Sequence, residues 1–298
     1  MKQTKIYSFS LFIVSILIIS SCNSDRSSEH LPGITIGMMD ILDTIPPEPK
    51  EIYYHMSLPV EMAHLFEQVG ANYFPDILNP STNLSRYNTN LKLALNLGIY
   101  GVDLSYVKMF EKQQNTVNYL NAIQKLSDEL GLPREIYTDV LTNLENYVSN
   151  KDSLTKVSTD IYKATDHYLR KAGEGSAAAM VLMGGWVEGM YIATQIFERD
   201  QGNIKLLEKI AEQKYSLNSL ISLMNNYHGN EEMTEYLLML KNLRRSYDKF
   251  QIYYIADDVD VDTVNKIISA SKYYIDVKPE QILEISTKLA SLRDKIIR

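Results

Sequence analysis

Apolar residues recur at spacings of three and four positions from about Leu58 onward, and no other feature of the sequence constrains the fold as strongly. Leu91, Leu95 and Val102 form one such series, and Leu289 belongs to another near the end of the chain. This spacing places apolar side chains on one stripe of an α-helix, and that stripe has to be buried against other helices. The sequence therefore predicts an all-α fold, either a multi-helix bundle or a short α-α superhelix.

Glycine and proline divide this region into pieces of helical length. Gly131, Gly173 and Gly202 each follow an apolar series, at the place where a helix end often needs a residue in the left-handed conformation. Pro279 suits the first turn of a final helix. We expect helices over 58–69, 84–112, 114–130, 133–149, 152–172, 175–200, 203–228, 231–255, 262–274 and 279–297.

The segment 252–277 has a mixed pattern. Tyr253 and Tyr274 belong to short runs of isoleucine and tyrosine, which are typical of strands. Between these runs lie Asp257, Asp258, Asp260 and Asp262. The aspartates resemble the opening of a calcium-binding loop, but Thr263 stands where such a loop needs glycine. We interpret Asp262 instead as the cap of the helix expected over 262–274.

The first residues have the composition of a targeting segment. Lys2 and Lys5 precede an apolar run from Ile6 to Ile19, which is shorter than the roughly 20 residues with which a helix crosses a bilayer. A positive start and a short apolar run are typical of a secretory signal peptide. The run ends in Ile19, Ser20, Ser21 and Cys22, and this cysteine is the only one in the sequence.

A branched apolar residue, two small residues and a cysteine in this order resemble the lipobox of bacterial lipoproteins. The resemblance implies that the Cys22 sulfur carries diacylglycerol, that residues 1–21 are removed and that the lipid holds the protein to a membrane. Each buried methylene contributes about 0.8 kcal/mol, so two or three acyl chains together give stable attachment. A cysteine that follows an ordinary signal peptide or an anchor helix by chance is the alternative.

We therefore expect an exported protein that is tied to the cell envelope through Cys22, with no cofactor besides this lipid and no intramolecular disulfide. Asn23 favours the outer membrane, because aspartate at this position would signal inner-membrane retention in some bacteria. Residues 22–57 are expected to form a tether and an irregular segment, and residues 58–298 a single helical domain.

The helical region contains an internal similarity. Phe110 and Glu111 match Phe197 and Glu198, which lie 87 residues later in the chain. At the same offset, Gly98 matches Gly185. Duplication would make 85–172 and 173–255 two similar helical units. Chance alignment of two periodic helical sequences is the alternative.

A stretch rich in small residues contains Gly185, Trp186 and Gly189, and Gly98 and Gly101 repeat the feature earlier in the chain. Glycine inside a helix costs close to 1 kcal/mol relative to alanine, so a compensating gain is expected. We favour a tight crossing of two helices as that gain. A cleft in which a ligand approaches the backbone, with the indole as one wall, is the alternative.

Asp103 and Glu188 are acids inside otherwise apolar helices. Buried acids need partners or lose their charge, and a pair facing one cavity could serve as an acid–base site. Contact with the rim of the helix or with a tyrosine is the alternative. Glu61 and His64 have the spacing of a di-iron ligand pair, but the sequence has no second copy, and we expect no metal site.

The formal net charge of −7 argues against a nucleic-acid partner, which would require a basic face. Tyrosine at exposed positions favours contact with a protein, peptide or glycan, but most of the 21 tyrosines fall at helix-period positions, so packing in the core and at its rim explains them first. Because no catalytic motif is recognisable, we expect a non-enzymatic helical lipoprotein with a binding or structural role. The alternative is an enzyme or a solute-binding protein with a pocket between the two helical units.

Overall fold

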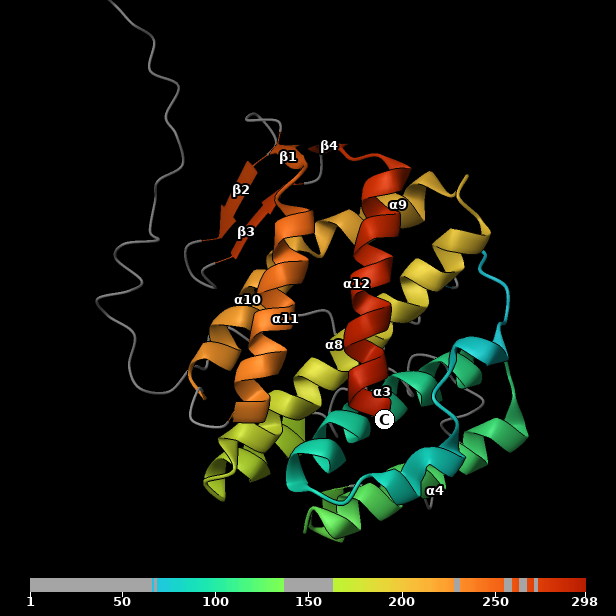
Figure 1. Cartoon of the computed structure of the whole chain (residues 1–298), viewed down its shortest axis with the longest axis vertical. Helices are drawn as coiled ribbons and strands as arrows, with labels where there is room; N and C mark the ends of the chain where they lie inside the picture. Colours follow the sequence, from blue (N-terminus) through green and yellow to red (C-terminus); the bar gives the residue numbers. More distant parts are fainter. Residues whose placement is uncertain are drawn as a thin grey trace, which may run out of the picture. The chain divides into compact units, whose positions relative to one another are not determined.

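The computed structural model describes Phe66 and residues 69–136, 163–227, 231–254, 259–262, 267–270 and 273–298. These residues form an all-α helical bundle that carries two short pairs of strands, as Figure 1 shows. All of them belong to the compact unit Pro49–Arg298. Several positions singled out from the sequence lie outside the described residues, namely Cys22, Glu61, His64, Asp257 and Asp258.

The two central helices are α3 (Asn90–Met109) and α8 (Gly175–Arg199), which cross in close contact. Buried residues occur around nearly the whole circumference of α8, as expected for a helix surrounded by others. Its length and composition would also allow it to span a membrane, but 94% of the apolar stretch is buried within the protein. On the other side of α3 packs α4 (Gln113–Glu129).

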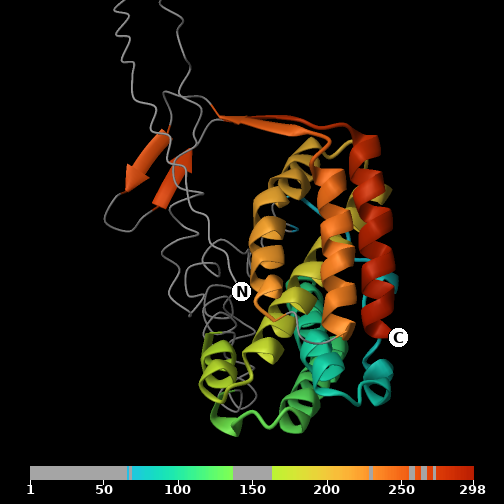
Figure 2. The same ribbon diagram turned by 60° about the vertical axis from the view of Figure 1, so that its left-hand side comes forward.

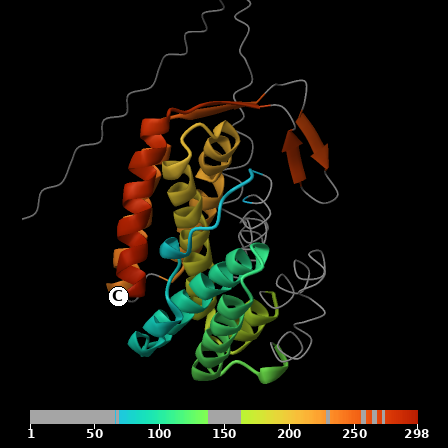
Figure 3. The ribbon, with the colours of Figure 1, turned by 90° about the vertical axis from the view of Figure 1, so that its right-hand side faces the viewer.

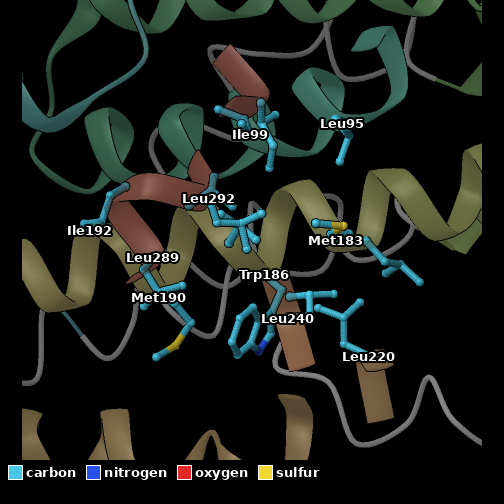
Figure 4. Close-up of a cluster of buried hydrophobic side chains, with 14 of the residues drawn as sticks. Leu95, Ile99, Met183, Trp186, Met190, Ile192, Leu220, Leu240, Leu289 and Leu292 are labelled. Carbon is cyan, nitrogen blue, oxygen red and sulfur yellow. The ribbon is translucent and has the colours of Figure 1, made fainter. Parts of the chain in front are cut away.

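The remaining helices of the described region are α9 (Ile204–Glu212), α10 (Lys214–Asn225), α11 (Glu231–Tyr247) and α12 (Pro279–Ile297). A further helical stretch covers 163–171. α12 packs on α8 and α11, and α10 packs on α11. Leu289 and Leu292 of α12 meet Trp186 and Met190 of α8 in one continuous core, which Figure 4 shows in close-up.

The helices over 114–130, 175–200 and 279–297 were predicted to within one residue at each end. Gly131 and Gly173 adopt the expected left-handed conformation, with φ of 71° and 82°, whereas Gly202 does not. The helix expected over 203–228 is instead divided at Gln213 into α9 and α10. Both halves keep their apolar stripes on the core, so periodicity alone did not reveal the break.

The helix expected over 84–112 begins six residues later than predicted, at Asn90, where the Thr89 side chain caps it. The preceding residues form two 3-10 helices, η2 (Pro75–Ile77) and η3 (Ser81–Arg86). A third, η4 (Arg134–Ile136), lies at the start of the helix expected over 133–149, most of which is outside the described residues.

The prediction of helices up to 255 and over 262–274 was wrong. α11 ends at Tyr247, and β1 (Gln251–Tyr254) then pairs with β4 (Tyr273–Asp276) in antiparallel fashion. β2 (Val259–Asp262) pairs likewise with β3 (Ile267–Ala270), so Asp262 ends a strand. Figure 2 shows the strands leaving the bundle between α11 and α12. The β-branched and aromatic residues of this segment outweigh its weak helical periodicity.

Candidate functional site

A buried ion pair joins α8 to α12. Glu188 has no exposed surface and Arg293 is 7% exposed. The Arg293 Nε donates to Glu188 Oε2 at 2.6 Å, and a terminal nitrogen of Arg293 donates to Oε1 at 2.8 Å. This two-pronged geometry is the strong form of the arginine–carboxylate pair. Both oxygens of Glu188 are therefore engaged by one guanidinium.

Asp103 of α3 lies beside this pair and is also fully buried. Its Oδ2 accepts a hydrogen bond from the Asn79 backbone N–H at 3.2 Å, whereas Oδ1 has no hydrogen-bond partner among the described residues. Burial and the nearby charge of Glu188 raise the pKa of Asp103 well above its usual range, and Arg293 opposes this only in part. The structure thus brings together the two acids that the sequence singled out.

Residues 72–87, which we call the strap, contact this cluster through Asn79 and Ile77 and lead into α3. The strap lies in the cyan segment of Figure 3. Three tyrosine hydroxyls donate to its backbone carbonyls, each at 3.0 Å: Tyr100 to Pro80, Tyr106 to Asn72 and Tyr119 to Asn79. Arg293 supplies a fourth donor, to the Ile77 carbonyl at 3.1 Å. Irregular backbone can be buried only when its polar groups find such partners.

Burial also keeps these tyrosines in their donating form. It raises the pKa of Tyr106 to about 12 and moves the pKa values of Tyr100 and Tyr119 further from neutrality. An ionised Asp103 would raise the pKa of Tyr100 and Tyr119 further. The hydroxyls therefore remain protonated donors over the physiological pH range.

Asn79 of the strap and Asn96 of α3 form a polar centre, and both are fully buried. The Asn79 side chain donates to the Tyr87 hydroxyl at 3.0 Å and to Asn96 Oδ1 at 3.3 Å. Asn96 in turn donates to the Ile296 carbonyl of α12 at 3.3 Å. Nothing in the sequence marks Asn79, because isolated asparagines are common in loops. Asn96 stands between Leu95 and Leu97 inside α3 and was overlooked.

Arg293 was also missed, although the sequence contained a signal for it. Its position falls between Leu289 and Ile296, on the stripe of α12 that is otherwise apolar and buried. A cation at such a position needs a buried acid as partner, and the sequence offered Asp103 and Glu188.

The glycines lie where α3 and α8 cross. A Cβ on Gly98 would overlap the Val181 carbonyl oxygen, and one on Gly184 would overlap the Leu95 carbonyl oxygen. The two contacts are reciprocal, because each glycine lies against the carbonyl three residues before the other glycine. The crossing therefore has a local twofold relation in which Gly98 corresponds to Gly184 and not to Gly185. The Gly185 backbone nitrogen would lie 2.7 Å from a Cβ on Gly98.

The other residues of this group have separate surroundings. A Cβ on Gly101 would meet nothing within 4 Å, and Gly189 is buried within α8. Trp186 is 5% exposed and donates from Nε1 to Ser216 Oγ of α10 at 2.9 Å. The indole thus links α8 to α10 inside the core.

A hollow with a volume of about 660 Å³ lies on the surface, and neither Asp103 nor Glu188 lines it. Within it Lys295 pairs with Glu235 at 2.7 Å, and Arg298 pairs with Asp294 at 2.7 Å. In the part of the chain that the structure describes, no three His, Cys, Asp or Glu side chains are placed to hold a metal ion.

Comparison with protein-family models, with curated proteins and with solved structures gave no match.

Proposed function

We propose that this protein is a lipid-anchored component of the cell envelope whose helical body has a binding or structural role rather than a catalytic one. The main support for this proposal is the burial of the two acids in the helical body. Asp103 and Glu188 have no exposed surface, and Glu188 is fully engaged by Arg293. A general acid or base has to come within hydrogen-bonding reach of its substrate, and neither carboxyl is open to one.

The glycines support the same interpretation. A ligand cleft at Gly98 would need space between α3 and α8, whereas the backbones of the two helices are in direct contact there. Trp186, the proposed wall of such a cleft, is buried and hydrogen-bonded to α10.

The β1–β4 pair supports a binding role. Tyr253 and Tyr274 lie opposite each other with nearly parallel rings, and they are 54% and 63% exposed. Ile252 and Ile275, on the other face of the pair, pack against the core. Exposed tyrosines of this kind are enriched where proteins contact other molecules. The predicted partner classes are a protein, a peptide or a glycan.

Attachment through Cys22 can be tested by metabolic labelling with palmitate in a bacterial host. The wild-type chain should be labelled and sediment with membranes. Because the chain has no other cysteine, Cys22→Ser should abolish both completely. Asn23→Ala is the matched control and should stay labelled. A Cys22→Ser protein that still takes up palmitate would contradict the proposal.

The binding role can be tested by cross-linking in intact envelopes, with Tyr253→Ser/Tyr274→Ser compared with wild type. We expect a cross-linked protein or glycan species that the double variant loses at unchanged expression. Equal recovery by both proteins would rule out this surface as the contact.

A further inference from the structure

The ionisable groups buried at the junction of α3, α8 and α12 comprise more acids than bases. Asp103, Glu188 and Arg293 are all buried, so two carboxyl groups share one guanidinium. If both acids were ionised, the junction would hold an uncompensated negative charge, which is very costly away from water. Arg293 already contacts both oxygens of Glu188, which leaves Asp103 without a cation of its own.

The geometry indicates which acid carries a proton. Oδ2 of Asp103 accepts the Asn79 N–H, while the buried Oδ1 has no hydrogen-bond partner among the described residues. The carboxyls of Asp103 and Glu188 lie within hydrogen-bonding reach of each other. A proton on Asp103 Oδ1 turns an unsatisfied acceptor into a donor toward the Glu188 carboxylate, which balances both the charge and the hydrogen bonding.

We propose that the α3–α8–α12 junction is a proton-binding site, with Asp103 as the neutral acid at physiological pH, and that loss of this proton at alkaline pH loosens the strap. The strap is directly coupled to the site at two points. The Asn79 amide donates to Asp103, and the guanidinium that holds Glu188 also holds the Ile77 carbonyl. An ionised Asp103 would compete with Glu188 for Arg293 and draw the guanidinium away from the strap.

Other titratable groups around the junction do not change charge in the same range. Tyr100 of α3, Tyr119 of α4, Tyr191 of α8 and Tyr87 of the strap all face it, and burial raises the pKa of each. Arg293, from α12, stays charged. The direction of the effect then follows from linkage. An acid whose pKa is raised by folding stabilises the fold at low pH, and this contribution falls as pH rises from the unfolded value of 3.8.

The proton can be detected directly in the full mature chain. Carbon-13 NMR of aspartate-labelled protein at about pH 7 should show one carboxyl with the shift of a neutral acid, absent in Asp103→Asn. Asp76→Asn, which removes an exposed carboxylate paired with Arg199, should leave this signal unchanged. A spectrum in which every aspartate is ionised at this pH would overturn the proposal, and this measurement requires no variant to fold.

Coupling to the strap is tested by hydrogen exchange of the Leu78 amide, which donates to the Pro75 carbonyl within the strap and lies next to Ile77. In wild type, its protection factor should fall by about tenfold or more as the pH rises from neutral into the alkaline range, after correction for the intrinsic pH dependence of exchange. In Asp103→Asn it should stay constant, because the amide carries no ionisable proton. Equal loss of protection in both proteins would show that the strap opens independently of Asp103.

Discussion

Gly98 and Gly184 show how single residues set the geometry at the centre of the bundle. Each lies against a backbone carbonyl of the other helix, so neither position has room for even a methyl group. The loss of helix propensity at a glycine is close to 1 kcal/mol, and close packing of the two longest helices offsets it. Backbone cannot move aside as a side chain can, and the contact is therefore intolerant of substitution.

Gly98→Ala should destabilise the protein by about 3 kcal/mol, since the added methyl overlaps the Val181 carbonyl and the helices must separate. Gly101→Ala is a matched control three positions further along α3, where a Cβ meets nothing within 4 Å. It should stabilise by up to about 1 kcal/mol through helix propensity. Urea unfolding measures both changes. Similar effects of the two substitutions would contradict the crossing described for α3 and α8.

At the scale of single residues, part of the candidate site could be predicted from the sequence. Asp103 and Glu188 stood out because charged residues are rare on buried helix faces. Arg293 could have been found by the same criterion, since Leu289 and Ile296 flank it on one stripe. Asn79 could not, because its role depends on hydrogen bonds to Asp103, Tyr87 and Asn96 that only the folded chain brings within reach.

Of all the elements described, the strap has the conformation that depends least on local sequence. Its regular backbone hydrogen bonds are those of two short 3-10 helices, and side chains from α3, α4 and α12 also bind its carbonyls. Tyrosine suits this task because its ring fills the core while its hydroxyl reaches the backbone. Part of the high tyrosine content of the chain thus serves internal hydrogen bonding rather than surface contact.

Tyr119→Phe should cost about 1–3 kcal/mol, because it leaves the buried Asn79 carbonyl without its tyrosine donor. The ring itself is retained, so little packing is lost. Tyr253→Phe, on an exposed ring of β1, provides the comparison and should change stability by less than about 0.5 kcal/mol. Thermal unfolding followed by circular dichroism distinguishes the two. If Tyr119→Phe were as stable as wild type, the strap would not depend on this hydrogen bond.

The elements predicted well are those with local determinants. α4, α8 and α12 combine a continuous apolar stripe with a clear start or stop signal, so their ends could be located from the sequence. The start of α3 was placed six residues too early, although Thr89 is a local start signal whose side chain accepts a hydrogen bond from the Lys92 N–H. The strands β1 and β4 were missed as a pair because strand pairing is non-local.

At the scale of the whole molecule, Arg293 connects three parts of the chain. It binds Glu188 at a separation of 105 residues and Ile77 at a separation of 216 residues. Its guanidinium also lies over the Tyr191 ring, 4.2 Å from the centroid. The C-terminal helix is therefore the element that joins the strap to the centre of the bundle.

Arg293→Met should lower the free energy of unfolding by about 3–5 kcal/mol at neutral pH, because Glu188 would remain buried without its cation. Methionine keeps most of the length of the side chain, so the loss is mainly electrostatic. Arg298→Met removes an exposed cation paired with Asp294 from the same helix and should cost less than about 1 kcal/mol. Guanidinium unfolding of both variants provides the measurement. A small effect of Arg293→Met would show that the buried pair with Glu188 contributes little to stability.

The bond between Arg293 and the Ile77 carbonyl also orders events during biogenesis. A growing chain cannot form this bond until Arg293 has been made, 216 residues after Ile77. For the exported protein proposed here, the strap therefore stays open until α12 has also crossed the membrane. A bond between residues so far apart is thus suited to a protein that has to cross a membrane before it folds.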